Sequence, residues 1–414
     1  MIHWMRAWLA PVALALAGCL TPPGTPAAPP PLILVSIDGF RADYLDRGLT
    51  PVLQGLAAGG ARADGMRPSF PSVTFPNHYT LVTGLRPDRH GIVNNTMQDP
   101  AFPGATFTLS NREEALRPRW WNGAEPVWVT AERHGARTAT MFWPGSEVAI
   151  RGVRPHDWAV FDQTLPSSAR VDRLLSWFDR PPGARPRFAT LYFDIVDTQG
   201  HTFGPDSAEL NAALAEVDAA LGRLTDGLRA RGVRANLVVV SDHGMAALAP
   251  ERTIHLDAIV APASIEARWL THYHVGVAPA AGRTAEVEAA LLGRHGALEC
   301  WRKDDIPARF RFGRNPRVPP IFCLPDVGWS IVSAARPLPY GPGKGAHGYD
   351  NADPAMAALF VAAGPDIAAG VRLPRFDNVD VYPLLMRLIH LPAAPNDGDP
   401  ATLAPALRGA EATP

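Results

Sequence analysis

Three runs of apolar residues along the chain predict strands that are buried on both faces of a sheet. Residues 32–37 (LILVSI), 188–193 (FATLYF) and 237–240 (LVVV) are dominated by aliphatic, aromatic and β-branched side chains. This pattern is typical of parallel strands that helices cover on both sides. Helical segments separate the runs, so we predict an α/β fold with a central, mostly parallel sheet built from right-handed βα units.

Apolar residues spaced three and four positions apart predict the helices that flank this sheet. The clearest helix ends near Gly232 and has Leu or Val at positions 210, 214, 217, 221, 224 and 228. Asp206 and Glu209 have capping-box spacing, which predicts that Asp206 caps the start of this helix. We expect shorter helices at residues 50–58, 74–83, 124–134, 168–178 and 379–391, and further strands at residues 138–142 and 357–362.

The pattern weakens between Met245 and Gly345, where Pro and Gly are frequent. We expect an inserted subdomain or cap at residues 245–345, with a strand at 273–278 and a helix at 284–292. Residues 100–121 show no clear period of apolar residues. We expect a loop there that can include a hairpin. The main domain is expected at residues 32–391, and the Ala- and Pro-rich residues 392–414 are expected to form a frayed tail.

The N-terminal residues predict export from the cytoplasm. Residues 1–18 contain one Arg and an apolar run that is too short, and too interrupted by Pro11, for a membrane span. Leu16-Ala17-Gly18 before Cys19 resembles the end of a bacterial lipoprotein signal, and a plain signal peptide cleaved nearby is the alternative. Residues 19–31 are Pro-rich and predict an extended tether. We therefore expect a periplasmic lipoprotein that meets the membrane only through a lipid on Cys19.

Composition narrows the possible partners. The 414 residues include 39 Lys and Arg and 40 Asp and Glu, with a formal net charge of −1. There is no basic block, so a nucleic-acid polymer held by its phosphates is not expected as a partner. We also expect a monomer. Apart from Cys19 the cysteines are Cys300 and Cys323, which we expect to form a disulfide in an oxidising compartment. They lack the C-x-x-C spacing of a zinc site.

Several carboxylate and imidazole residues follow the predicted strands. Asp38, Asp197 and Asp242 come after three different strands, and the carboxyl ends of parallel strands are where ligands collect. The nearby or later histidines are His201, His243 and His347. These residue types are ligands of zinc, and the number of them suits two ions better than one tetrahedral ion. Two divalent ions can hold both the attacking and the leaving oxygen of a phosphoryl transfer.

Thr74 lies where the helix at residues 74–83 is expected to begin, just before Phe75 and Pro76. A hydroxyl at this position lies at the positive end of the helix dipole, where the first backbone N–H groups favour an anion. Bound to a cation, such a hydroxyl loses its proton more easily and becomes a nucleophile. The segment alone also fits an ordinary N-cap threonine, and the downstream Asp and His residues favour the catalytic interpretation.

Seven motifs in this order resemble those of the nucleotide pyrophosphatase/phosphodiesterase family of the alkaline phosphatase superfamily. They are VSIDGFRADYL at Asp38, PSVTFPNHYTLVTGLRPDRHGI at Thr74, NN at Asn95, FWPGSE at residues 142–147, LYFDIVDTQGHTFGP at Asp197, SDHGM at Asp242 and GAHGYDN at His347. The resemblance covers residues 32–391 and implies an alkaline-phosphatase-like fold for a catalytic domain.

The resemblance also implies a role for each matching residue. Thr74 is implied as the nucleophile that becomes phosphorylated before water hydrolyses the intermediate. Asn95 is implied to donate a hydrogen bond to a non-bridging phosphate oxygen. Asp194 has no implied role and is expected to be a solvated loop carboxylate. Two zinc sites are implied, one formed by Asp38, Thr74, Asp242 and His243 and the other by Asp197, His201 and His347.

The apolar ring of Phe75 beside the nucleophile favours a phosphodiester over a monoester. By resemblance, Phe75 and Tyr192 would stack on a nucleobase, with Trp158 as a third wall, although Tyr192 and Trp158 also fit ordinary core aromatics. We predict an enzyme that hydrolyses phosphodiester or pyrophosphate bonds of nucleotides and nucleotide diesters and releases a nucleoside monophosphate. The alternatives are a glycerophosphocholine or lysophospholipid phosphodiesterase with the same two-metal site, and an inactive surface lipoprotein that binds a ligand.

Overall fold

The computed structural model describes residues 29–271, 273–334 and 344–409. The predicted signal peptide and most of the predicted tether lie outside the described residues. An eight-stranded sheet forms the centre of the fold, with strand order β20-β2-β19-β9-β1-β8-β6-β7. Its strands are β1 (Leu32–Ile37), β2 (Ala61–Ala63), β6 (Thr138–Met141), β7 (Asp157–Trp158), β8 (Phe188–Phe193), β9 (Asn236–Val240), β19 (Phe360–Ala363) and β20 (Val371–Leu373).

The three apolar runs lie side by side in the middle of this sheet. β1 pairs in parallel with β8 on one side and with β9 on the other, and β6 pairs in parallel with β8 and β7. β19 is antiparallel to both β9 and β2, so the sheet is mixed towards that edge. The prediction of a mostly parallel α/β sheet is confirmed.

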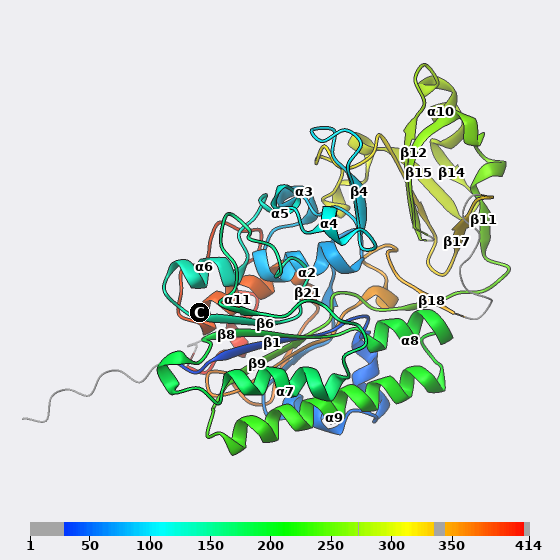
Figure 1. The fold of residues 1–414 in the computed structure, drawn as a ribbon. Helices are drawn as coiled ribbons and strands as arrows, with labels where there is room; N and C mark the ends of the chain where they lie inside the picture. The colour runs from blue at the N-terminus through cyan, green and yellow to red at the C-terminus, as the bar shows by residue number, and fades with distance from the viewer. Residues whose placement is uncertain (1–28, 272, 335–343, 410–414) are drawn as a thin grey trace, which may run out of the picture.

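Helices cover both faces of the sheet (Figure 1). Leu32 and Leu34 of β1 belong to one apolar core, and Ile33 and Val35 belong to the other. Because both faces of β1 are buried, its sequence shows no alternation of polar and apolar residues. One face carries α1 (Pro51–Ala58), α7 (Ser167–Trp177), α8 (Ile195–Phe203) and α9 (Ala208–Ala230), and the other carries α2 (Thr74–Thr83), α6 (Val127–Arg133) and α11 (Val381–Leu388).

Helix α9 is capped by a different residue from the one predicted. Its cap is Ser207, whose Oγ accepts the backbone N–H of Leu210 at 3.1 Å. Asp206 instead pairs with Arg47 at 2.8 Å, so the predicted Asp206 cap is wrong. A serine and an aspartate cap a helix about equally well, so capping preference alone does not distinguish the two neighbours.

The inserted region contains an antiparallel sheet of which the sequence pattern predicted only one strand. In Figure 1 this sheet projects away from the central sheet, close to β4. Cys300 and Cys323 lie directly opposite each other on two of its strands and form the predicted disulfide. Its strand order is β12 (Ile265–Thr271), β13 (His274–Pro279), β16 (Ile321–Pro325), β15 (Leu298–Arg302) and β14 (Gly293–His295), and it is accompanied by α10 (Thr284–Leu291).

A short pair of strands closes the base of the inserted region. β10 (Ala246–Ala247) is antiparallel to β18 (Gly345–Ala346). The chain therefore leaves the main domain just after His243 and returns just before His347. The rings of these two histidines stack with their centroids 3.5 Å apart.

Short elements link these layers, and a hairpin forms near the predicted loop at residues 100–121. Within the described residues, no helix has the length and apolar character needed to cross a bilayer. The short elements are β3 (Met66–Arg67), α3 (Pro87–His90), β4 (Thr96–Gln98), β5 (Thr106–Thr108), α4 (Arg112–Ala115), α5 (Pro118–Trp121), β11 (Thr253–His255), β17 (Ser330–Val332) and β21 (Phe376–Asp377).

The described part of the C-terminal segment, residues 392–409, packs against the main domain. The backbone N–H of Ala394 donates to the hydroxyl of Tyr382 at 3.0 Å, and Asp397 accepts the backbone N–H of Arg86 at 2.9 Å. Leu403 and Leu407 are buried in the same core as α2 and α11. The expectation of a frayed tail is therefore wrong for these residues, because Leu403, Ala406 and Leu407 hold them against the core.

Candidate functional site

The carboxyl ends of three neighbouring strands bring the candidate carboxylates together. Asp38 follows β1, Asp242 follows β9, and Asp197 lies in α8, which follows β8. Since β1 pairs with both β8 and β9, all three carboxylates lie at one edge of the sheet. Gly39 has φ +69°, and a Cβ added to it would lie 2.9 Å from Asp197 Cα. Glycine at this position therefore allows the chain segments of Asp38 and Asp197 to approach each other.

Thr74 is the first residue of α2, as the sequence predicts, and its hydroxyl faces this cluster. The preceding Val73 has an extended backbone, and Gly84 ends the helix in the left-handed conformation. Thr74 Oγ1 lies 3.3 Å from His243 Nε2. The start of α2 therefore lies next to the carboxylate cluster, although the two are far apart along the chain.

One backbone N–H group at the start of α2 already has a partner. Phe75 N–H donates to Asn95 Oδ1 at 2.8 Å. This N–H group is therefore occupied by Asn95 in this structure. Because Asn95 Oδ1 accepts this bond, the donor that Asn95 offers to a ligand beside Thr74 is its Nδ2.

Asp38, Asp242 and His243 form a buried group next to Thr74. His243 Nε2 lies 3.0 Å from Asp242 Oδ2 and 3.5 Å from Asp38 Oδ1. The other oxygen of Asp38 accepts a hydrogen bond from Tyr192 OH at 2.6 Å, and the other oxygen of Asp242 accepts the backbone N–H of Gly39 at 3.2 Å. Each carboxylate thus has one oxygen fixed by the protein and one directed at His243.

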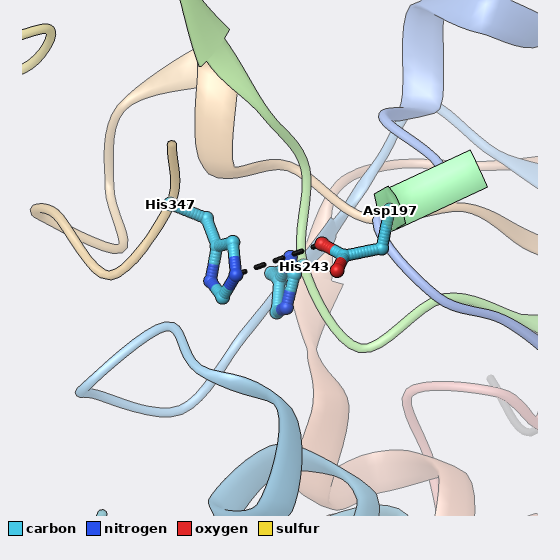
Figure 2. A group of neighbouring side chains, drawn as sticks. All are labelled: Asp197, His243 and His347. Atoms are coloured by element: carbon cyan, nitrogen blue, oxygen red, sulfur yellow. Dashed lines mark ion pairs between the residues drawn. The ribbon is translucent and has the colours of Figure 1, made fainter. Parts of the chain in front are cut away.

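Asp197, His201 and His347 form a second group beside the first. Asp197 Oδ1 lies 3.4 Å from His201 Nε2 and 3.6 Å from His347 Nε2. Figure 2 shows His243 beside Asp197 and His347, and the donor atoms of these three residues all lie within 4.8 Å of one another. His243, which the resemblance assigns to the first group, therefore also borders the second.

The three histidines share one hydrogen-bonding arrangement. The Nδ1 atoms of His201, His243 and His347 lie 2.9 to 3.0 Å from the backbone carbonyl oxygens of Gly345, Gly244 and Ser72 respectively. Since a carbonyl can only accept, each Nδ1 carries the proton and each Nε2 carries the lone pair. Each Nε2 faces a carboxylate, which is the orientation of histidines that bind metals through Nε2.

The open carboxylate oxygens fit a cation. Asp38 Oδ1, Asp197 Oδ1 and Asp242 Oδ2 are buried and have no hydrogen-bond partner among the described residues. Burial raises the pKa of Asp38 and of Asp197, and for Asp38 the neighbouring carboxylates Asp242 and Asp197 add to the effect. Such groups are costly to bury as anions unless a cation compensates them. Carboxylate oxygens and imidazole Nε2 atoms in one cluster are a donor set that suits zinc.

His78 also lies against the cluster, although no pattern in the sequence singled it out as a ligand. Its Nδ1 lies 2.9 Å from Thr74 O and 3.4 Å from Asp242 Oδ2, and its Nε2 lies 2.8 Å from Ser36 Oγ. Because Nδ1 donates its proton to the carbonyl of Thr74, it has no lone pair to offer a metal. His78 therefore supports the first turn of α2, a role that its spacing of four residues from Thr74 fits.

A pocket of about 480 Å³ opens beside the cluster. Phe75 and Tyr192 line it, as the resemblance implies. Trp158, the predicted third wall, does not line it and lies partly exposed on β7, with the Arg154 guanidinium 5.3 Å from its ring centroid. Phe161 lines the pocket instead and packs edge-on against Tyr192, with ring centroids 5.9 Å apart.

The acidic residues that line this pocket outside the cluster are both paired with arginine. Glu147 accepts a bond from Arg112 at 2.6 Å, and Asp194 accepts one from Arg170 at 2.6 Å. Asp194 is therefore the partner of a buried guanidinium and not the solvated carboxylate that we expected. Arg170 also donates to the backbone carbonyl oxygens of Gln163, Leu165 and Tyr192.

Comparison with known proteins gives matches over most of the chain. The family model for type I phosphodiesterases/nucleotide pyrophosphatases matches residues 32–350. An uncharacterised pyrophosphatase/phosphodiesterase of Schizosaccharomyces pombe is 42% identical over 390 residues, which is 89% of this chain and 78% of that protein. Human ectonucleotide pyrophosphatase/phosphodiesterase family member 1 is 35% identical over 405 residues, or 93% of this chain. The match spans only 42% of the human protein.

Solved structures show the same fold. Murine ectonucleotide pyrophosphatase/phosphodiesterase 5 superposes with a TM-score of 0.86 at 32% identity, over 91% of this chain and 100% of that one. A second structure of the murine protein is an inactive threonine-to-alanine variant in complex with AMP, with a TM-score of 0.86 over 92% of this chain and 100% of that one. These structures confirm the fold that the sequence motifs imply.

Proposed function

Because this chain belongs to the type I phosphodiesterase/nucleotide pyrophosphatase family and is a phosphodiester hydrolase, we propose that it cleaves nucleotide diesters and pyrophosphate bonds and releases a nucleoside monophosphate. We further propose that Thr74 is the nucleophile and that two zinc ions bind in the cluster. The observation that carries this proposal is the position of the Thr74 hydroxyl, 3.3 Å from His243 Nε2 and beside the two groups of carboxylate and imidazole donors.

In the proposed reaction, Thr74 Oγ1 attacks phosphorus and the bond to the leaving oxygen breaks, which leaves the nucleotide on Thr74. Water then attacks the same phosphorus and regenerates the hydroxyl. Asn95 Nδ2 donates to a non-bridging oxygen as its charge increases. When bound, zinc supplies the positive charge that lowers the pKa of the hydroxyl and neutralises the phosphate. We assign one ion to Asp38, Thr74, Asp242 and His243 and the other to Asp197, His201 and His347.

The walls of the pocket favour a nucleotide over a choline ester. A quaternary ammonium group is recognised by aromatic rings, and uncompensated negative charge nearby strengthens its binding. Arginine neutralises both Glu147 and Asp194. The pocket lining outside the cluster therefore offers no uncompensated carboxylate to a quaternary ammonium group. Phe75 and Phe161 offer aromatic surface on which a planar base can stack, and AMP is the ligand of the related murine variant.

The test is a comparison of two esters on one zinc-loaded preparation. We expect kcat/KM for the nitrophenyl ester of thymidine monophosphate to exceed that for nitrophenyl phosphorylcholine by at least about fivefold, because stacking of a base contributes about 1–3 kcal/mol. The reverse preference would favour the choline alternative. A preparation that holds zinc yet hydrolyses neither ester would contradict both assignments.

Arg170→Lys is expected to raise KM for the nucleotide ester by about tenfold and to change kcat by less than about twofold. Arg170 holds the segment that carries Phe161, through bonds of 3.3 Å to Gln163 O and 2.9 Å to Leu165 O. The single ammonium group of lysine cannot donate to both carbonyl oxygens with the geometry of the planar guanidinium. The segment that carries Phe161 therefore loses its fixed position. Kinetics with the nucleotide ester and with bis(nitrophenyl) phosphate, which has no base, measure this effect.

Arg317→Lys is the matched control. Arg317 is also largely buried, pairs with Asp99 at 2.6 Å and donates to three backbone carbonyls, but it does not line the pocket. Both variants are expected to lose stability, and only Arg170→Lys is expected to change KM selectively for the nucleotide ester. Equal KM changes in the two variants, or on the two substrates, would show that Arg170 has no positioning role.

We also propose that the protein is an exported, monomeric lipoprotein with residues 1–18 as its signal, a lipid on Cys19, a tether at residues 19–31 and a catalytic domain at residues 32–391. The matched human and murine relatives are named ectonucleotide enzymes, which agrees with export. The predicted disulfide, present between Cys300 and Cys323, agrees with an oxidising compartment.

A further inference from the structure

A series of hydrogen bonds connects the inserted sheet to the start of α2. His274, the first residue of β13, lies with its Nε2 2.9 Å from Asn94 Nδ2. Asn94 Oδ1 accepts the backbone N–H of Asn95 at 2.7 Å, and Asn95 Oδ1 accepts the N–H of Phe75 at 2.8 Å. Asn94 and His274 are both fully buried, so water does not replace the bond between them. The series ends one residue from Thr74.

The direction of each bond follows from its donors and acceptors. Asn94 Oδ1 is occupied by the N–H of Asn95, so the amide presents its Nδ2 hydrogens to His274. His274 Nε2 must therefore accept, which requires a neutral ring with its proton on Nδ1. Burial lowers the pKa of His274 to about 4, in agreement with a neutral ring. If the amide of Asn94 turned over, the bond from the backbone N–H of Asn95 would be lost, because an amide nitrogen cannot accept it.

His274 is itself held firmly by the inserted sheet. Its ring stacks on Phe322 of β16 with centroids 5.4 Å apart, and the next residue, Val275, pairs with Cys323 in the sheet. A Cβ added to Gly348 would lie 3.2 Å from His274 Nδ1, so the ring also packs against the residue that follows His347. The inserted sheet thus contacts the segments of both Asn95 and His347 through one side chain.

We propose that His274 is a positioning residue for phosphoryl transfer: it fixes the amide of Asn94 and, through it, the backbone of Asn95. This inference rests on the proposed role of Asn95 as the donor to a non-bridging phosphate oxygen. Because Asn95 Oδ1 is held by Phe75 N–H, a fixed backbone at Asn95 leaves its Nδ2 in one direction beside Thr74. The inserted region then takes part in catalysis without touching the substrate.

A double-mutant cycle between positions 274 and 95 tests the inference. His274→Phe keeps the stacked ring and removes the acceptor, and we expect it to lower kcat for the nucleotide ester by about tenfold with zinc content unchanged. Asn95→Ala alone is expected to lower kcat by about 10²- to 10³-fold. Added to Asn95→Ala, His274→Phe is expected to change kcat by less than about twofold, because the donor that it positions is already absent.

His90→Phe is the matched control, since His90 is another buried histidine, bonded to Thr80 Oγ1 at 3.0 Å and to the backbone N–H of Ile92 at 3.1 Å. It is expected to change kcat by less than about twofold in either background. Asn94→Ala breaks the same series at its next member and is expected to lower kcat by about tenfold, as His274→Phe does. It takes the place of His274→Phe in the cycle if that variant does not fold.

Two results would overturn the inference, and they are distinguishable. If Asn95→Ala is slow and His274→Phe or Asn94→Ala slows it tenfold further, the residues act independently and this inference alone is wrong. If Asn95→Ala retains the parent kcat, the proposed role of Asn95 is wrong and the inference fails with it.

Discussion

Thr74→Ala is expected to lower kcat for the nucleotide ester by at least about 10³-fold, because the variant lacks the oxygen that attacks phosphorus. The other donors of the cluster come from different elements, so the variant is expected to fold and to retain bound zinc. Initial rates with the nitrophenyl ester of thymidine monophosphate, together with metal analysis of the same sample, measure both expectations.

Thr74→Ser is the matched variant, since it keeps a hydroxyl at the first position of α2. It is expected to retain far more activity than Thr74→Ala. When it is quenched during turnover, intact-mass analysis is expected to find a nucleotide bound to Ser or Thr at position 74 and none in Thr74→Ala. If Thr74→Ala turned over the ester at the parent rate, the nucleophile would have to be another group.

Removal of divalent ions with a chelator is expected to lower activity by at least about 10³-fold, and added zinc is expected to restore it. The same treatment is expected to lower Tm, because it leaves the open oxygens of Asp38, Asp197 and Asp242 buried without compensation. Activity and thermal unfolding of one sample, before chelation, after it and after addition of zinc, measure the two effects. Unchanged activity in the fully chelated protein would contradict the zinc proposal.

The stabilisation of the folded protein by zinc is expected to increase as the pH rises. Without metal, burial together with Asp242 and Asp197 raises the pKa of Asp38. A group with a raised folded-state pKa contributes stability below its unfolded-state pKa, and that contribution is lost as the pH rises through the folded-state pKa. Zinc binds only the carboxylate form, so the increase in Tm produced by zinc is expected to grow as the pH rises through that pKa.

A pair of histidine variants provides the control for the metal experiments. His347→Ala is expected to lower the bound zinc from two ions per chain towards one and to remove most of the activity. His255→Ala changes an exposed histidine on β11 and is expected to alter neither quantity. Equal zinc contents in these two variants would remove His347 from the proposed ligands.

The parts of the fold that follow from local pattern were predictable from the sequence. β1 and β8 have the predicted limits because their apolar runs are long enough to identify strands buried on both faces. The ends of these strands and of β9 also indicated Asp38, Asp197 and Asp242, since ligands collect at the carboxyl edge of a parallel sheet. The inserted sheet was largely unpredicted, because short strands such as β15 and β14 mix polar and apolar residues with no clear period.

The parts of the site that depend on side-chain packing could not be predicted in this way. Phe161 and Trp158 are close in sequence, and only the path of the chain after β7 places the first on the pocket wall and leaves the second outside it. The proton positions of the histidines depend on backbone carbonyls from distant segments, such as Ser72 O for His347. The pairing of Asp194 with Arg170 has the same origin in tertiary structure.

The antiparallel ladder between β10 and β18 joins the two ends of the insertion. His243 and His347 stand on the two sides of that ladder, so the length of the chain between its two strands does not set the distance between these histidines. Grafting a unit of another length onto this ladder would leave the pocket lining unchanged, because the residues that line the pocket all lie outside residues 245–345. A grafted unit would still have to bring its own acceptor for the amide of Asn94, and this requirement defines which units are compatible.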